Sequence, residues 1–441
     1  MNPNTQLATA PASYGDHIQV LSRRYEEALR YCGLKAIVIN AGELLPVFLD
    51  DQHYPHKTNP HLLQWLPLIG VPDASLIYEH GKKPRLLVLT PDDFWHAAPE
   101  LPDNSYMCHF DLEIYTEAHK FDSALNKLPR KTAFIDPTDD GKGINPEKLL
   151  NVLDYYRSIK TDYEVECISA ATAVALEAHE AARRAFERGE SGFNIHIAFL
   201  QAAGCSEHEL PYPDIIACNQ SAAVLHYEKR THKIKPHSML IDAGTSINGY
   251  ACDITRTYSS IPQFAELIAA LDALQQSLCQ EIKPGICFGE AQHSAHLGIG
   301  GILRDHNLAN LSPETMVAKG VTAAFFPHGL GHMLGLQVHD VGGQMADISG
   351  KTQPPPKEHP HLRMSRSLEP GMVLTVEPGL YFIPMLLDQL KAADIADKLN
   401  WTAIDKLAPC GGIRIEDNIV ITDTGAYNIT RNCQRPPVSS Q

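Results

Sequence analysis

The chain has 441 residues, a length that favours two domains over a single core. Its hydrophobic content of 44% with 20% charged residues is ordinary for a globular protein and argues against disorder. The formal net charge of −15 argues against nucleic acid or an anionic membrane as partner, because both attract basic surfaces. No run reaches the roughly 18 apolar residues of a membrane span. Without a leader-like start or regular spacing of the ten cysteines, we expect no disulfide framework and a cytoplasmic location.

The first part of the chain has the pattern of a compact α/β domain. Residues 17–32 place apolar side chains at helical spacing and are followed by Gly33, a common helix end. Strands that alternate with helices are typical of an α/β domain. No catalytic motif is apparent here, so we expect this domain to serve dimerisation or to cover a site. Strand-like apolar runs lie at 36–40, 75–80, 85–90 and 132–137, and a helix-like segment begins at residue 147.

A capping box marks the expected domain boundary near residue 160. Thr161 and Glu164 have the spacing in which a hydroxyl and a carboxylate cap the first turn of a helix. This helix should run to about Arg188, where Gly189 can adopt the left-handed conformation that ends helices. We therefore predict domains at 1–160 and 161–441. Further helices are predicted at 191–204, 264–283 and 289–305.

Residues 325–340, FFPHGLGHMLGLQVHD, hold three histidines. His328 and His332 are four residues apart, the spacing with which helical H-E-x-x-H enzymes bind zinc. Gly329 and Gly331 between them disfavour a helix. The residues alone leave open whether this segment binds a metal and, if so, where the remaining ligands lie.

An Asn248-Gly249 dipeptide between two apolar runs predicts a hairpin that brings Asp242 and Asp253 together. With that dipeptide as the turn, the two aspartates are diagonal neighbours on one face, roughly 7–8 Å apart at the backbone. Both carboxylates could then reach one cation. Two surface aspartates beside a turn are the alternative.

Two glutamates lie in apolar, strand-like segments. Glu416 belongs to GGIRIEDNIVIT, where isoleucines alternate with polar residues that include Arg414. Glu377 belongs to MVLTVEPGLYF. A carboxylate in so apolar a strand is costly unless it is paired or binds a metal, although either glutamate could instead be a solvated edge residue. With the two aspartates and one histidine they would supply four carboxylates, a set that suits two divalent cations and favours Mn²⁺ over zinc.

The segments IDAG…NGYACDITRT, HGLGHMLGLQVHD, LTVEPGLY and GGIRIEDN, in this order, resemble the dinuclear pita-bread metallopeptidases. The segments FLDDQHYPHK, YYRSIKTDYEVECI and LHY around His226 are similar to bacterial Xaa-Pro dipeptidases (prolidases) and their organophosphorus acid anhydrolase relatives. The resemblance spans nearly the whole chain. It implies an α/β N-terminal domain followed by an α+β pita-bread catalytic domain. One departure is Phe288, where those relatives often carry a tyrosine whose hydroxyl lies near the leaving-group side.

The resemblance also implies a role for each site residue. Two divalent metal ions, with Mn²⁺ expected, would be held by Asp242, Asp253, His332, Glu377 and Glu416, of which Asp253 and Glu416 would bridge. Glu377 would be the general base, and His328 and His339 would contact the oxyanion or the leaving nitrogen. The other substrate contacts would be His226, Tyr212, Arg363 for the substrate carboxylate (with Arg366 as second choice), and Asp51 from the neighbouring subunit of a homodimer. Arg414 would orient Glu416.

The implied reaction is hydrolysis of the peptide bond before the C-terminal proline of a dipeptide. This bond is a tertiary amide without an N–H for a protease to hold, whereas two metals act on the carbonyl oxygen and the water. The alternatives are an aminopeptidase P that accepts longer peptides and a non-catalytic pita-bread binding protein. A side activity on organophosphate esters is also expected, because a phosphoryl centre resembles the tetrahedral intermediate.

Overall fold

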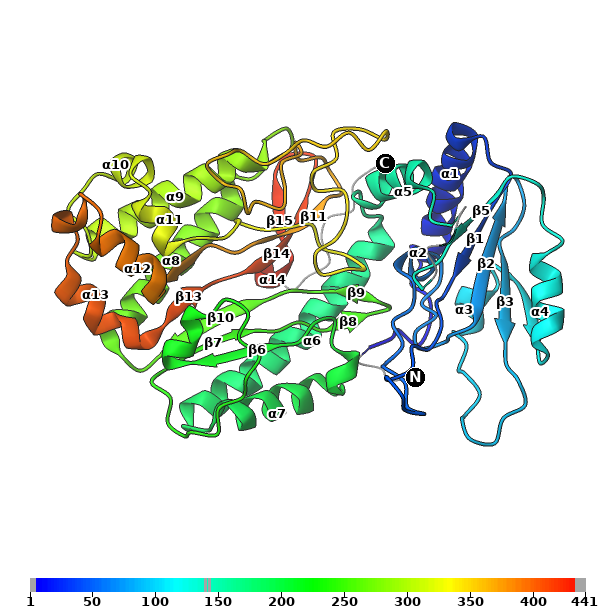
Figure 1. Ribbon diagram of the computed structural model, residues 1–441, viewed down its shortest axis with the longest axis horizontal. Coiled ribbons are helices and arrows are strands. Elements are labelled where there is room, and N and C mark those ends of the chain that lie inside the picture. Colours follow the sequence, from blue (N-terminus) through cyan, green and yellow to red (C-terminus); the bar gives the residue numbers. More distant parts are fainter. Residues whose placement is uncertain (1–4, 139–140, 142–143, 433–441) are drawn as a thin grey trace.

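A mixed five-stranded sheet forms the N-terminal part of the chain, at the right of Figure 1, in the computed structural model. The structure describes residues 5–138, 141 and 144–432. The sheet order is β4-β3-β2-β1-β5, with parallel pairing of β1 with β5 and of β3 with β4. The strands are β1 (Ala36–Asn40), β2 (Ala74–Glu79), β3 (Arg85–Leu89), β4 (Asp111–Tyr115) and β5 (Thr132–Ile135), and the helices are α1 (Tyr14–Cys32), α2 (Pro60–Trp65), α3 (Asn104–Met107), α4 (Ala118–Leu125) and α5 (Glu147–Arg157).

The apolar runs that predicted strands are confirmed, and so is the first helix, which ends at Gly33 with a φ of 68°. Strand β4 was not predicted from the sequence. Its apolar residues Leu112 and Ile114 are exposed at the edge of the sheet, so this segment lacks the buried run that marked the other strands.

Helix α6 (Asp162–Glu187) begins with the predicted capping box. The side chain of Thr161 accepts a hydrogen bond from the backbone N–H of Glu164, whose carboxylate accepts one from the backbone N–H of Thr161. Gly189 follows the helix with a φ of 77°. The next helix, α7 (Gly192–Ala203), packs with α6 on the apolar side of β6 (Ile215–Cys218) and β7 (Ser238–Asp242).

The remaining strands form a second layered region, at the left of Figure 1. Its two three-stranded sheets have the orders β10-β7-β6 and β11-β14-β15, and two two-stranded ladders join β12 with β13 and β8 with β9. Helices α8 (Pro262–Glu281) and α9 (Phe288–Asp305) share the largest hydrophobic core with β11 to β14. The strands are β8 (Ser246–Ile247), β9 (Tyr250–Ala251), β10 (Thr255–Ser259), β11 (Val373–Val376), β12 (Gly379–Tyr381), β13 (Gly412–Arg414), β14 (Asp417–Ile421) and β15 (Ala426–Asn428), and the shorter helices are α10 (Pro313–Ala318), α11 (Val321–Phe325), α12 (Pro384–Lys391), α13 (Trp401–Leu407) and α14 (Ile429–Asn432).

The hairpin register predicted from the Asn248-Gly249 turn is confirmed. Both turn residues have a positive φ, 54° and 87°, as a type I′ turn requires. Asp242 pairs with Thr255 across β7 and β10, which makes Asp253 its diagonal neighbour. The ladder is interrupted at residues 252–254, and Asp253 lies in this interruption.

The two glutamates do not lie inside continuous strands, and in this respect the prediction was wrong. Glu377 lies between β11 and β12, and Glu416 lies between β13 and β14. The chain changes partner at each break, since β11 pairs with β14 whereas β12 pairs with β13. Pro378, which has no N–H to donate, coincides with the first break. Both carboxylates are thereby placed where the two ladders meet.

Within the described residues, no helix has both the length and the apolar character needed to cross a membrane. The nine cysteines in this part of the chain are free thiols. Residues 349–363 form a loop without helix or strand, as their polar, proline-rich sequence predicts.

Candidate metal centre and catalytic cavity

The structure brings the five predicted metal ligands together around one buried point. Nε2 of His332 lies 3.5 Å from Asp253 Oδ2, 3.7 Å from Glu377 Oε1 and 3.9 Å from Glu416 Oε1. Asp253, His332 and Glu416 satisfy the spacing of a metal-ligand group. Asp242 joins them through Tyr212, whose hydroxyl donates to Asp242 Oδ1 at 3.1 Å and also to Asp253 Oδ1.

The hydrogen bonds of His332 leave its Nε2 available as a ligand. Its Nδ1 lies 3.0 Å from the carbonyl oxygen of Met333, and because a carbonyl only accepts, Nδ1 carries the proton. The lone pair of Nε2 therefore faces the carboxylates. A metal-binding histidine has its second nitrogen fixed in this way by a hydrogen bond.

The glycine-rich segment around His332 is not helical, because it must approach β11 closely. A Cβ on Gly331 would lie 2.0 Å from the carbonyl oxygen of Thr375. The backbone N–H of Thr375 in turn donates to the carbonyl of His332 at 3.0 Å. Only glycine allows this contact, so the interval of four residues between His328 and His332 is not a helical zinc motif.

The buried negative charges of the cluster favour the binding of cations. Burial raises the pKa of Asp253, Glu377 and Glu416, and repulsion from neighbouring carboxylates, including Asp242, raises it further. The guanidinium of Arg414 offsets the effect only partly. Four carboxylates and one imidazole Nε2 are a donor set that fits two divalent metal ions and would be costly to bury without them.

Arg414 has a direct ion-pair partner that was not predicted, Asp242. Its Nη2 donates to Asp242 Oδ2 at 2.6 Å, and the described contacts include no direct ion pair with Glu416. Its hydrogen-bonded link to Glu416 passes through Thr255, whose Oγ1 lies 3.3 Å from Arg414 Nε and donates to Glu416 Oε2 at 2.6 Å.

His328 and His339 differ in their surroundings. Burial lowers the pKa of His328 to about 3, with a further contribution from Arg414, so the ring is neutral at pH 7. Its Nδ1 donates to the carbonyl of Gly329 at 2.9 Å, which leaves Nε2 to accept from Tyr381 at 2.8 Å. Burial and the nearby His332 lower the pKa of His339 to about 4. No described residue hydrogen-bonds to the His339 ring, so its N–H remains available.

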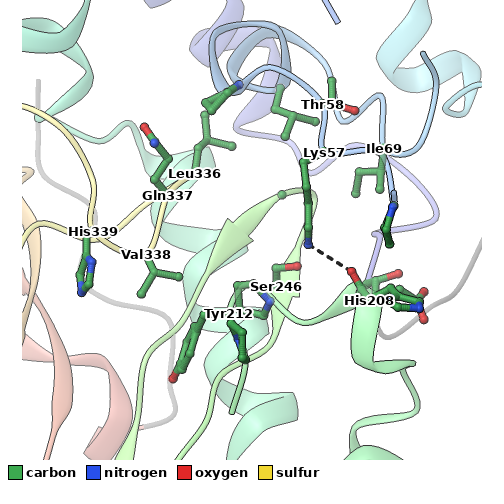
Figure 2. Close-up of a pocket in the computed structure, with 18 of the residues that line it drawn as sticks. Lys57, Thr58, Ile69, His208, Tyr212, Ser246, Leu336, Gln337, Val338 and His339 are labelled. Atoms are coloured by element: carbon green, nitrogen blue, oxygen red, sulfur yellow. Dashed lines mark hydrogen bonds between the residues drawn. The ribbon is translucent and has the colours of Figure 1, made fainter. Parts of the chain in front are cut away.

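A cavity of about 780 Å³ opens onto this cluster, and Figure 2 shows part of its lining. The predicted site residues that line it are Tyr212, His226, His339, Asp242 and Asp253. Lys57 reaches across from the N-terminal part of the chain, and its ammonium donates to the carbonyls of His208 and Leu210 at 3.1 Å each. The cavity wall is therefore built from both parts of the chain.

The remaining predicted residues lie around this cavity. Arg363 is exposed, has no hydrogen-bond or ion-pair partner among the described residues, and is near enough to help lower the pKa of His339. Arg366 is buried and bound to Glu369, with its Nη1 3.0 Å from Ser158 Oγ. Asp51 is exposed on a loop, outside the described lining of its own chain's cavity. Phe288 is fully buried in the hydrophobic core at the start of α9.

Sequence reasoning missed two side chains that connect the ligands. Tyr381 accepts from Arg414 Nη1 at 2.8 Å and contacts His328, and Thr255 links Arg414 to Glu416. A signal for each was present, because Thr255 is opposite Asp242 in the predicted hairpin and Tyr381 ends the LTVEPGLY motif of Glu377.

Comparisons with known proteins identify the family. The model of metallopeptidase family M24 matches residues 166–423, and that of the Xaa-Pro dipeptidase N-terminal domain matches residues 12–155. The chain is 42% identical to a Xaa-Pro dipeptidase of Stenotrophomonas maltophilia over 428 residues, covering 95% of this chain and 97% of that protein. It is 43% identical to one of Colwellia psychrerythraea over 439 residues, covering 97% and 98%. Aminopeptidase P from E. coli has the same fold, with a TM-score of 0.71 at 23% identity over 95% of this chain and 96% of that one. The chain therefore belongs to metallopeptidase family M24, in the group that carries the Xaa-Pro dipeptidase N-terminal domain.

Proposed function

We propose that this protein hydrolyses dipeptides with a C-terminal proline, using two divalent metal ions. The observation that carries the proposal is the group of three carboxylates within 3.9 Å of His332 Nε2, joined by Asp242 through Tyr212 and next to the cavity. The relatives that are 42–43% identical over nearly the whole chain are named Xaa-Pro dipeptidases, which supports the substrate. The oxygen-rich donor set favours Mn²⁺ as the ion.

The ligand assignment is the one that the family resemblance implies, and the cluster of side chains supports it. Asp253 and Glu416 would bridge the two ions, Asp242 would hold one, and His332 with Glu377 would hold the other. Such a metal pair, when bound, polarises the scissile carbonyl and lowers the pKa of water. Arg414 holds Asp242 in place and reaches Glu416 through Thr255.

Glu377 is the proposed general base. Burial and the neighbouring Glu416 raise the pKa of its carboxyl group above the usual range while no cation is bound. It lies between His332 and His328, each with a ring nitrogen 3.7 Å from one of its oxygens. From this position it would take a proton from the attacking water and pass it to the proline nitrogen.

His339 is the proposed donor to the developing oxyanion. It is neutral at pH 7, lines the cavity, and has an N–H that no described residue occupies. His328 is less suited to this role, because its one N–H already donates to Gly329. We assign His328 instead to holding Tyr381 and, through it, Arg414. Tyr212 contributes its ring to the cavity wall, since its hydroxyl is bound to the two aspartates.

Arg363 is the proposed contact for the free carboxylate of the substrate proline. Its guanidinium, which has no partner in the part of the chain that the structure describes, can bind a carboxylate in bidentate fashion, and it lies near His339. Such a contact distinguishes a dipeptidase from an aminopeptidase P, whose longer substrates place no carboxylate there. His226, which is exposed and lines the same cavity, would also contact the substrate. A substrate without the carboxylate, such as an organophosphate ester, would be a side substrate.

A kinetic comparison of substrates tests the proposal. The Mn²⁺-loaded protein should cleave Xaa-Pro dipeptides with a kcat/KM roughly ten- to hundredfold above that for Xaa-Pro-Yaa tripeptides, because the tripeptide loses a charge-assisted contact. Equal or better cleavage of the tripeptides would show an aminopeptidase P. If neither class of peptide were cleaved, the proposal would be wrong.

We further propose a homodimer in which Asp51 completes the site of the neighbouring subunit. Asp51 lies outside the described lining of its own cavity, on a loop whose Phe48 and Leu49 are 86% and 91% exposed. Exposed apolar side chains of this size favour burial against another protein surface. The carboxylate of Asp51 would then bind the amino group of the substrate.

Mixing two variants, one impaired and one inactive, tests this arrangement. Asp51→Asn should lower kcat/KM about tenfold through the lost charged contact, and Asp253→Asn should be inactive. A mixed dimer contains one site with an intact Asp253 and an intact Asp51 from the other subunit. After the two variants are dissociated and reassociated together, about a quarter of the sites should be fully active, since half of the dimers are mixed. No gain over the unmixed variants, or a monomer by sedimentation, would contradict the shared site.

A further inference from the structure

Three ionised side chains meet in the interior beside the catalytic cluster. Asp340 Oδ2 accepts from Lys160 Nζ at 2.8 Å, and Asp340 Oδ1 accepts from the guanidinium of Arg157. Lys160 also donates to the carbonyl of Arg157 at 3.0 Å. The side chains of Asp340 and Lys160 have no exposed surface, and Arg157 has 2%. We call Asp340, Arg157 and Lys160 the junction triad.

The aspartate of the triad closes the loop that separates two site histidines. Residues 333–340, the 333–340 loop, begin directly after His332 and contain His339. The backbone N–H of Asp340 donates to the carbonyl of Met333 at 2.9 Å, which joins the two ends of the loop. The rings of His332 and His339 consequently pack edge to face, with centroids 4.5 Å apart.

The cations of the triad come from a distant part of the chain. Arg157 is the last residue of α5, and Lys160 precedes Thr161, which caps α6. Arg157 also donates to Gln337 within the 333–340 loop. The backbone N–H of Lys160 donates to the carbonyl of Gly371 at 2.8 Å, just before β11. The segment that leads from the N-terminal part into α6 therefore anchors the loop of His339.

The fit of this loop around the triad is tight. A Cβ on Gly335 would lie 2.3 Å from Asp340 Oδ2 and 2.9 Å from Lys160 Cε, so the backbone of the loop contacts the ion pair directly. Burial would raise the pKa of Asp340, but Arg157 and Lys160 hold it at about 2. The carboxylate therefore remains ionised, and the anchor does not weaken, at any pH where the enzyme would be assayed.

We propose that Asp340 is a positioning residue, which fixes His339 against His332 by tying the 333–340 loop to Arg157 and Lys160. The inference rests on the proposed role of His339 in catalysis. If Asp340 has this role, the geometry of the site depends on the position of residues 157–160. An unanchored loop would let His339 move away from the substrate carbonyl, and a misplacement of about 1 Å can cost a hundredfold in rate.

The test is a double-mutant cycle between Asp340→Asn and His339→Ala on the metal-loaded enzyme. If Asp340 acts through His339, Asp340→Asn should lower kcat/KM roughly ten- to hundredfold in the wild-type background and less than about twofold in the His339→Ala background. The metal content should stay unchanged. Multiplicative effects of the two substitutions, or an unimpaired Asp340→Asn enzyme, would overturn the proposal.

Two further variants separate positioning from stability. Asp154→Asn removes a carboxylate from the same junction, where it lies 3.5 Å from His61, and its side chain makes no hydrogen bond to the 333–340 loop among the described residues. It should leave kcat/KM near the wild-type value. Lys160→Met keeps the Arg157–Asp340 pair, so it serves in the same cycle if Asp340→Asn does not fold. Coupling to His339 and an unchanged metal content would then support the positioning role, and the absence of coupling would contradict it.

The split between kcat and KM gives a readout that a mere loss of stability would not produce. Asp340→Asn should lower kcat with little change in KM for the dipeptide, because the metal ligands and Arg363 are untouched while His339 no longer lies in place against His332. An unchanged kcat, or a loss confined to KM, would contradict positioning. A fully active His339→Ala enzyme would instead show that the proposed function assigns His339 wrongly.

Discussion

Asp253→Asn is expected to abolish hydrolysis of Xaa-Pro dipeptides and to release at least one metal ion per subunit. The substitution keeps the size of a side chain that is 5% exposed, but it removes the negative charge proposed to bridge two cations. A metal pair supplies several kcal/mol to such a reaction, so its loss corresponds to a decrease of roughly a thousandfold or more in kcat/KM. Steady-state kinetics with metal analysis of the same sample measure both effects.

A matched control for Asp253 is Asp417, an aspartate that is fully buried. Its carboxylate is bound at 2.7 Å by Arg256 and by Arg431, so its charge is balanced within the protein. Asp417→Asn should lower the free energy of unfolding while two metal ions are still bound. If Asp253→Asn turned over normally with two ions in place, Asp253 would not be a bridging ligand.

Arg363→Ala is expected to lose dipeptide hydrolysis while both metal ions remain. The guanidinium is exposed and has no partner among the described residues, so its removal leaves no buried group unsatisfied. The loss of a charge-assisted hydrogen bond, worth about 1.5–3 kcal/mol, corresponds to a decrease of roughly ten- to more than hundredfold in kcat/KM. Xaa-Pro amides and organophosphate esters, which lack the carboxylate, should be affected far less.

Arg366 provides the comparison for this prediction. It is buried, stacks on the ring of Tyr155 at 3.8 Å and binds Glu369 and Ser158, so Arg366→Ala should lower stability rather than discriminate between substrates. Equal losses in Arg363→Ala on substrates with and without a carboxylate would show that Arg363 supports the fold or the metals. The preference for dipeptides would then need another explanation.

Local signals in the sequence were sufficient for the parts of the site that depend on neighbouring residues. The Asn248-Gly249 turn determines the register in which Asp242 pairs with Thr255, because a two-residue turn allows few alternatives. The capping box of Thr161 and Glu164 likewise identifies the start of α6. These features need no information from distant parts of the chain.

The remaining features depend on contacts between segments far apart in the sequence. The breaks at Glu377 and Glu416 arise where β11 to β14 exchange partners, and an apolar pattern does not reveal such an exchange. The pairing of Arg414 with Asp242 and of Arg157 with Asp340 joins residues more than 170 positions apart. Propensity and periodicity, which act over a few residues, carry no signal for these pairs.

Several expectations stay predictions. The domain boundary near residue 160, the cytoplasmic location, Mn²⁺ as the ion and the roles of individual side chains all await experiment. The side activity on organophosphate esters also stays a prediction, which an assay of their hydrolysis would test.

The number of metal ions per active subunit tests the central claim most directly. Metal-free wild-type protein and Asp253→Asn would be titrated with Mn²⁺ while bound metal and Xaa-Pro hydrolysis are followed together. The wild type should bind two equivalents, with activity that rises as the second is filled, and Asp253→Asn should bind at most one and stay inactive. Full activity of the wild type with one equivalent, or with none, would contradict a dinuclear site built from Asp242, Asp253, His332, Glu377 and Glu416.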